Sequence, residues 1–367
     1  MGPVEARLAR LRGRTLPRRH DARTISALTA NPGCARRAVL DAAGADKQKL
    51  AAHAGYPAPF GQSEFAITRG NAFEAQLKDD GAAQLLTLLR EVLDLEILEA
   101  HYTDLNDVGG NQDSELRHVY TKQRLIAAAG RAGTMFDHPL LRLSVAGRHA
   151  YLEPDLIVFQ LRGMFHVVEI KSFAIIDGQA DPVKVAAAAV QSAVYVLALR
   201  DLLGRDDQVH YETILVCPRD FSSRPAAARI DVRRQLTVLK RQLARVARIE
   251  ELLAEYPDDL TFDLDPDEHL RPRRPPGDLA DAIRTVGANY TPECLSTCEL
   301  CYLCRDEAQR TTGALGKAVR ADLGGIEFTG QVLDLAGGAI PGQDREEVAV
   351  MLRQAAQLRE QILGEAG

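Results

Sequence analysis

The chain has no tryptophan, few other aromatic residues and no excess of positive charge: aromatics make up 5% of its 367 residues, and the net charge is −6. A protein with this balance is not a polycation. Any surface that binds nucleic acid must therefore come from a local concentration of basic residues. One such concentration lies near the N-terminus, between Arg7 and Arg23.

Long hydrophobic runs are missing as well. Arginines interrupt the first residues of the chain, which argues against a secretory signal. The longest apolar stretch, Val183 to Leu199, contains Lys184 and Gln191, so we expect no membrane span and a cytoplasmic protein. The phosphate-binding motif G-x-x-x-x-G-K-[ST] is also absent, so any unwinding of a duplex would have to come from a partner.

The composition that remains, 46% hydrophobic and 26% charged, is that of an ordinary globular protein. The periodicity of its apolar residues predicts the following elements. We expect helices over residues 33–43, 70–93, 114–129, 181–202, 226–256 and 346–363. We expect strands over residues 141–145, 151–159, 164–173 and 210–217. The order of helix, three strands, helix and strand predicts an α/β core with a mixed sheet.

Composition and charge divide the chain into three parts. We expect a basic N-terminal arm (1–24), a main domain (25–305) with a helical insertion or linker (226–290), and a helical C-terminal extension (306–367).

Two acidic residues and a lysine stand out in the second and third predicted strands. Glu169 and Lys171 share one face because side chains alternate along a strand. A hairpin turning about Arg162 would place Asp155 opposite Glu169, with Cβ atoms roughly 5 Å apart. Two opposed carboxylates favour Mg²⁺ or Mn²⁺, which can activate water and stabilise charge on a phosphate. The alternative is a β-hairpin with a surface salt bridge, although a lone charge in this apolar strand would be costly.

Two further sites lie on predicted helices. Gln191 and Tyr195 are four residues apart and share a helix face among small apolar neighbours, so they could point at the sheet. The alternative is a partly buried tyrosine beside an exposed glutamine. Glu74 lies one turn into a helix after Gly70 and could supply a third carboxylate, or be an ordinary surface residue favoured by the helix dipole.

Together these residues resemble the RecB-like branch of the PD-(D/E)-x-K nucleases. In that branch an acidic or histidine ligand follows a glycine, and P-D, (D/E)-x-K and Q-x-x-x-Y come after it in order. The resemblance covers roughly residues 25–305. The matching residues are Gly70 and Glu74, Pro154-Asp155, Glu169-Ile170-Lys171, and Gln191 with Tyr195.

The resemblance implies a restriction-endonuclease-like core, with a mixed central sheet flanked by helices, and hydrolysis of phosphodiester bonds in DNA. It implies that Asp155, Glu169 and Lys171 are catalytic, and that Gln191 and Tyr195 position the substrate and the lysine. The implied metal ligands are Glu74, Asp155, Glu169 and the backbone carbonyl of Ile170.

Four of the six cysteines fall within a short segment, spaced Cys294-x₃-Cys298-x₂-Cys301-x₂-Cys304. Thiols this dense in a reducing compartment indicate a metal site rather than disulfides. The spacing allows either a structural zinc site or an iron–sulfur cluster. Of the other two cysteines, Cys217 precedes Pro218 and is expected to be a plain core residue.

The segment around Cys34 resembles the N-terminal part of the iron–sulfur members of the same branch, the CRISPR-associated exonucleases and the cluster-containing helicase–nuclease subunits. In them one N-terminal cysteine joins three C-terminal cysteines to hold a [4Fe-4S] cluster. This implies Cys34 with Cys298, Cys301 and Cys304 here, and Cys294 as a substitute.

The leading hypothesis is therefore a DNA exonuclease or end-processing nuclease in anti-phage defence, recombination or repair. Its expected partners are DNA, as single strands or ends, and a helicase or defence-system protein. The alternatives are a non-catalytic DNA-binding scaffold subunit and a restriction-type endonuclease with a Cys₄ zinc site.

Overall fold

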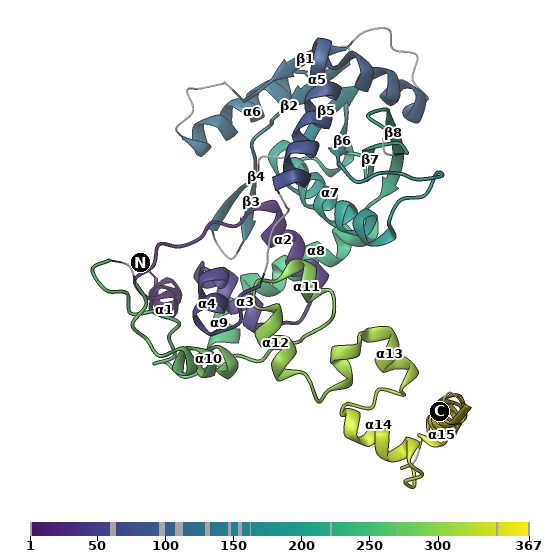
Figure 1. Ribbon diagram of the computed structural model, residues 1–367. Coiled ribbons are helices and arrows are strands. Elements are labelled where there is room, and N and C mark those ends of the chain that lie inside the picture. Colours follow the sequence, from purple (N-terminus) through teal and green to yellow (C-terminus); the bar gives the residue numbers. More distant parts are fainter. Residues whose placement is uncertain are drawn as a thin grey trace.

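The structure is a computed structural model with three parts that lie side by side in space (Figure 1). We call them the sheet lobe, the cysteine lobe and the C-terminal helices. The structure describes residues 2–58, 64–94, 100–106, 113–128, 133–145, 148–152, 156–161, 163–220, 222–269, 271–342 and 344–365.

The sheet lobe is built on a six-stranded sheet in the order β1-β2-β5-β6-β7-β8, and β3 and β4 form a separate hairpin. Strands β1 and β2 are parallel, as are β6 and β7, and the other neighbours are antiparallel. The strands are β1 (His101–Asp104), β2 (Thr134–Asp137), β3 (Leu141–Val145), β4 (Arg148–Leu152), β5 (Leu156–Leu161), β6 (Met164–Ile170), β7 (Glu212–Pro218) and β8 (Pro225–Asp231). The prediction of a mixed sheet in an α/β protein is confirmed.

Helices outnumber strands in the described part of the chain. They are α1 (Pro3–Arg12), α2 (Ala22–Ala30), α3 (Ala35–Ala43), α4 (Lys47–His53), α5 (Glu64–Leu93), α6 (Ser114–Ala128), α7 (Pro182–Leu203), α8 (Arg233–Ala247), α9 (Ile249–Leu253), α10 (Pro276–Thr285), α11 (Cys294–Thr297), α12 (Cys301–Glu307), α13 (Lys317–Asp322), α14 (Thr329–Ala336) and α15 (Glu346–Glu365). Two short 3₁₀ turns are η1 (Asp206–Gln208) and η2 (Thr312–Leu315).

Each face of the sheet is covered by a different long helix. Val168 and Ile170 of β6 pack with Phe73 and Leu77 of α5. Val167, on the other face, belongs to the core around α7. Helix α5 is interrupted by non-helical backbone at residues 79–82. The alternation along β6 therefore separates the sheet into an α5 face and an α7 face.

Helix α7 begins as the sequence predicts. The Asp181 side chain accepts hydrogen bonds from the backbone N–H groups of Val183 at 2.9 Å and Lys184 at 3.4 Å, and Pro182 takes the first helical position. The helix is apolar and long enough to cross a membrane by length and composition. In this fold, however, its apolar side chains pack in the core of the sheet lobe, which accounts for its hydrophobicity.

Two sequence-based expectations about these elements are wrong. The strand expected over 151–159 is two strands in different sheets, because β4 pairs with β3 whereas β5 pairs with β2 and β6. The helix expected over 226–256 begins with a strand instead. Its alanine-rich start has high helix propensity, but β8 completes the edge of the sheet beside β7, and that pairing outweighs local preference.

The cysteine lobe combines segments from both sides of the sheet lobe in the sequence. Leu8 and Leu11 of α1 are buried in the same core as Leu279 and Ile283 of α10. Residues expected to form a basic arm thus include a packed helix, and Arg7 donates a hydrogen bond to the carbonyl of Tyr256 at 2.6 Å. Along the sequence, the chain therefore forms one part of the cysteine lobe, then the sheet lobe, and then the rest of the cysteine lobe.

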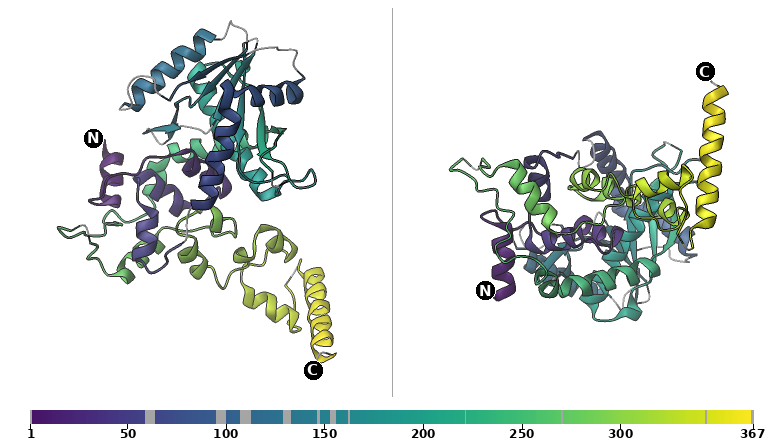
Figure 2. Two further views of the ribbon diagram at one scale, coloured as in Figure 1. Left: turned by 45° about the horizontal axis from the view of Figure 1, so that its top comes forward. Right: turned by 90° about the horizontal axis from the view of Figure 1, so that it is seen from below.

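The C-terminal helices α13, α14 and α15 extend away from the other two parts (Figures 1 and 2). The helix expected over 346–363 is confirmed as α15. The buried core of this part is small, consisting of Ile326, Leu335 and Ala349.

Candidate active site and cysteine cluster

Glu169 and Lys171 lie where β6 ends, and the structure pairs them. Glu169 is only 2% exposed and forms an ion pair with the Lys171 ammonium. The backbone N–H of Lys171 donates to the carbonyl of Val216 at 2.9 Å, which ties this end of β6 to β7. The buried carboxylate therefore has a fixed cationic neighbour on the α7 face.

Gln191 and Tyr195 of α7 extend this pair into a chain of polar contacts. Lys171 Nζ donates a hydrogen bond to Gln191 Oε1 at 2.9 Å, and Gln191 Nε2 donates to the Tyr195 hydroxyl at 2.9 Å. Tyr195 is 2% exposed, so this end of the chain is anchored inside the core. Four of the residues chosen from sequence are thus in contact, in the order Glu169, Lys171, Gln191 and Tyr195.

The predicted pairing of Asp155 with Glu169 is wrong, because Leu156 is the residue opposite Glu169. The last pair of the hairpin is Leu161 with Met164, so the turn has two residues rather than three. This shorter turn shifts the register by one. Asp155 itself, together with Pro154, lies outside the described residues.

Glu74 takes part in a different cluster from Glu169. Its carboxylate forms an ion pair with Lys78, one turn later on α5, and the Lys78 ammonium also lies 2.7 Å from Asp137 Oδ1. Asp137 ends β2 and is 1% exposed. These contacts raise the pKa of Lys78 against the opposing effect of burial, mainly through its hydrogen bonds to Asp137 and Glu74.

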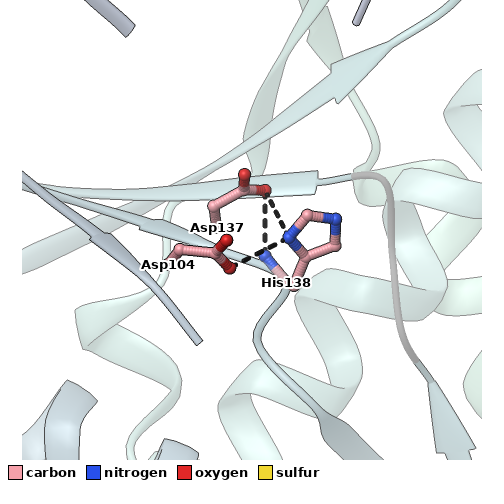
Figure 3. A group of neighbouring side chains, drawn as sticks. All are labelled: Asp104, Asp137 and His138. Carbon is pink, nitrogen blue, oxygen red and sulfur yellow. Dashed lines mark hydrogen bonds and ion pairs between the residues drawn. The ribbon is translucent and has the colours of Figure 1, made fainter. Parts of the chain in front are cut away.

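Asp137 also belongs to a group that the sequence analysis missed, with Asp104 and His138 (Figure 3). His138 Nδ1 lies 3.1 Å from Asp104 Oδ1 and 3.4 Å from Asp137 Oδ1. The Tyr102 hydroxyl donates to Asp137 Oδ2 at 2.5 Å, and burial together with this bond raises the pKa of Tyr102. The only signal in the sequence was the Asp137-His138 pair after a very short strand. Lys78 already supplies a cation to this group.

The two polar clusters share one edge of the sheet but lie on opposite faces. Asp104 and Asp137 are the last residues of the parallel strands β1 and β2, and Glu169 is next to last in β6. Asp137 and Val168 both pair with Ile157, so they point to the α5 face, whereas Glu169 points to the α7 face.

Cys34 and the four C-terminal cysteines line one cavity in the cysteine lobe. Cys34 precedes α3, and the others lie in or beside α11 and α12. Asn31 Nδ2 donates to Cys294 Sγ at 3.2 Å. The structure therefore brings together all five thiols that the sequence singled out for a metal. Cys217 is fully buried beside Leu215, as expected for a core residue.

Buried positive charge surrounds these thiols. Arg36 is 1% exposed and donates to Cys304 Sγ at 3.1 Å and to Glu307 Oε2 at 2.7 Å. Arg37 donates to the carbonyl of Thr297 at 2.7 Å and forms an ion pair with the buried Asp41 at 3.1 Å. Both guanidinium groups are thus paired with carboxylates, and Arg36 in addition donates a hydrogen bond to one of the thiols.

The thiols fit a shared metal group. Burial raises the pKa of Cys298 to about 12 and that of Cys304 to about 11, so neither would hold a thiolate without a bound cation. A metal group bound by several of these thiols would supply that cation, either as a zinc ion or as an iron–sulfur cluster.

No protein-family model, no curated protein and no solved structure matches the chain. Inference about its function therefore rests on the sites described above.

Proposed function

We propose that this protein is a metal-dependent nuclease of the PD-(D/E)-x-K type that hydrolyses phosphodiester bonds in DNA. The observation that carries the proposal is the contact chain from Glu169 through Lys171 and Gln191 to Tyr195. A surface salt bridge would not require a carboxylate that is 2% exposed, nor a glutamine positioned by a buried tyrosine.

The proposed metal site is formed by Glu169, Asp155 and the carbonyl of Ile170. Carboxylate and carbonyl oxygens are the donors that Mg²⁺ and Mn²⁺ prefer. A bound divalent ion supplies a more acidic water and a positive charge beside the scissile phosphate. Glu74 would serve as a ligand only after exchanging its Lys78 partner for the metal.

The chain's own residues account for the remaining steps. Lys171, held by Gln191, places an ammonium where it can orient a nucleophilic water and neutralise charge developing on the phosphate. Gln191 can do this because its amide N–H is already bound to Tyr195, which leaves its carbonyl oxygen facing the lysine. Glu169 holds the Lys171 ammonium from its other side by an ion pair.

The proposal includes a [4Fe-4S] cluster held by Cys34 and three of Cys294, Cys298, Cys301 and Cys304. Its support is the cavity that the five thiols share and the hydrogen bond from the buried Arg36 to Cys304. The cluster would have a structural role, because its ligands come from both chain segments of the cysteine lobe. A zinc site remains the competing assignment, and metal analysis of the purified protein separates the two.

The biological setting that we propose is DNA end processing in defence, recombination or repair, beside a helicase or defence-system protein. A non-catalytic DNA-binding scaffold is the second candidate. It would need neither the Glu169–Lys171 pair nor its anchor on α7.

A nuclease assay tests the proposal directly. Labelled single-stranded and double-stranded DNA are incubated with the protein and Mg²⁺ or Mn²⁺. Cleavage should require the metal and should be abolished in Asp155→Ala, Glu169→Gln and Lys171→Met. The matched control is Glu212→Gln, an acidic residue on the neighbouring strand β7, which should cleave normally. Full activity in Glu169→Gln would overturn the assignment.

A further inference from the structure

Helix α8 is the most basic element of this acidic protein. Its sequence, RRQLTVLKRQLARVA, contains five basic residues and no acidic one, whereas the whole chain has 45 basic and 51 acidic residues. Positive charge is therefore concentrated on α8, although the chain as a whole is acidic. A function in binding anions is one physical reason for such a concentration.

Three of these arginines form a stripe on the exposed face of the helix. Arg234, Arg241 and Arg245 are spaced by seven and four residues, so they lie on the same side of α8. All three are exposed. The opposite side carries Leu236 and Leu239, which are buried in the core of the sheet lobe. Packing thus fixes the direction in which the stripe points.

Within the described part of the chain, the stripe has no carboxylate in ion-pair range. Among the residues described, no carboxylate oxygen lies within 4.0 Å of the side-chain nitrogens of Arg234, Arg241 or Arg245, although other basic residues nearby are paired. These pairs are Arg233 with Asp231 at 2.5 Å, Lys240 with Asp206 at 3.5 Å, and Arg248 with Glu251 at 3.5 Å. Like charges four residues apart destabilise a helix by a few tenths of a kcal/mol. An anionic ligand would offset that cost.

Helix α8 is in contact with helices that belong to both proposed centres. Helix α8 packs against α7, which carries Gln191 and Tyr195, and against α2, which leads to the cysteine cluster (Figure 1). A Cβ added at Gly33, next to Cys34, would lie 3.4 Å from the Arg245 guanidinium. The end of the stripe therefore reaches the loop that presents Cys34.

We propose that Arg234, Arg241 and Arg245 bind the phosphate backbone of the nucleic-acid substrate outside the catalytic site. This inference rests on the proposed nuclease function and adds the surface that holds the uncut strand. The stripe spans eleven residues of helix beyond Arg234, about 16 Å at 1.5 Å per residue, which is enough to contact several successive phosphates. Guanidinium groups suit this role because they bind phosphate oxygens in pairs.

The test compares two triple variants of equal charge change. Arg234→Gln/Arg241→Gln/Arg245→Gln removes the stripe, and Arg271→Gln/Arg320→Gln/Arg359→Gln removes three exposed arginines elsewhere. Both are made in the full-length protein carrying Lys171→Met, so that DNA is not cut. Binding of a fluorescent single-stranded oligonucleotide and of a duplex is measured by anisotropy over a series of salt concentrations in EDTA.

We expect the stripe variant to bind at least about tenfold more weakly at physiological salt. The slope of log K against log[salt] should fall by about 2 for the single strand and about 3 for the duplex, since each lost phosphate contact removes about 0.7 or 0.9. The control variant should keep the parent affinity and slope. Thermal unfolding must give equal Tm values for both variants, because all six positions are exposed.

An unchanged affinity and slope in the stripe variant would overturn the inference. So would unchanged DNA binding together with lost binding to poly-L-glutamate, which would assign the stripe to an acidic protein. Neither result touches the nuclease proposal, which is decided by cleavage in Glu169→Gln. Conversely, loss of DNA binding in the stripe variant of a protein that does not cleave DNA would assign the stripe to DNA binding and overturn only the nuclease proposal.

Discussion

Lys171, directly after β6, and Gln191, on α7, are joined by a hydrogen bond of 2.9 Å from the ammonium to the amide oxygen. The glutamine is held in turn by Tyr195, deep in the core. These contacts hold the flexible side chain of Lys171, at the end of β6, in one direction. Losing part of this arrangement should therefore affect both cleavage and stability.

The first prediction separates positioning residues from the lysine itself. Gln191→Ala and Tyr195→Phe should each slow cleavage by about tenfold, which corresponds to one hydrogen bond of about 1.4 kcal/mol. Lys171→Met should abolish cleavage. Single-turnover rates on labelled DNA measure the difference, with Tyr211→Phe as the control. If Tyr195→Phe were as inactive as Lys171→Met, the positioning role would be wrong.

The second prediction concerns stability without any metal. Lys171→Met leaves the Glu169 carboxylate buried without its cation, and should lower the free energy of unfolding by about 1–3 kcal/mol. Adding Glu169→Gln to Lys171→Met should recover part of that loss, since the buried negative charge is then gone. Denaturant unfolding checks both variants, and Lys184→Met, an exposed lysine of α7, serves as the control. Additive losses in the double variant would contradict the buried pairing.

The third prediction concerns the cysteine cluster. Protein purified anaerobically should be brown, with about four irons per chain. Cys34→Ala should lower both the iron content and the Tm of the whole protein, because Cys34 belongs to one chain segment and its partners to another. Cys217→Ala should keep the iron, since Cys217 lies in the sheet lobe. A colourless protein with one zinc per chain that tolerates Cys34→Ala would refute the cluster.

The fourth prediction is a pH dependence at His166. Burial, aided by the neighbouring His210 and Arg229, lowers the pKa of His166 from 6.5 to about 4. Between pH 6.5 and pH 4 the His166 side chain is therefore protonated in the unfolded chain but neutral in the folded chain. Stability from this group is complete above pH 6.5 and is lost as the pH falls towards 4. Between pH 7 and pH 5 the loss should be about 2 kcal/mol.

His166→Phe provides the comparison for this prediction. Phenylalanine keeps a ring stacked on His210, whose centroid lies 5.1 Å from that of His166, and it does not titrate. The variant should lose less stability than the parent between pH 7 and pH 5. The free energy of unfolding is measured in urea at both pH values. If the parent and His166→Phe lose the same amount between pH 7 and pH 5, His166 does not titrate as stated.

The sequence predicted the helices and strands with strong periodicity, including α6, α7 and β3, because their patterns extend over enough residues. Short or ambiguous elements were missed. Strands β1 and β2 have four residues each, too few for an alternation to be recognised, and the alanines of β8 favour a helix locally. The missed strands are also the reason that Asp104 and Asp137 were not identified.

The sequence predicted the contacts in the candidate site between residues that are close in the chain. It could not predict those that depend on the register of two strands. Glu169 and Lys171 are two apart on one strand, and Gln191 and Tyr195 are four apart on one helix, so each pair follows from periodicity. The position opposite Glu169 depended on a turn of two or three residues, which the sequence does not distinguish. The meeting of Cys34 with the C-terminal cysteines came from the resemblance, since no local pattern links segments so distant.

The two-part origin of the cysteine lobe has a consequence for synthesis on the ribosome. Asn31 and Cys294, which are in contact in the finished cavity, are 263 residues apart in the chain. At roughly 5–20 residues per second, translation takes on the order of 13–50 s to produce the second after the first. During that interval the sheet lobe can fold, but the C-terminal cysteines that line the cavity with Cys34 have not yet been made. A group shared by Cys34 and the C-terminal cysteines can therefore be loaded only after Cys294 to Cys304 have been made, and a chain truncated before Cys294 should have a folded sheet lobe and an incomplete cysteine lobe.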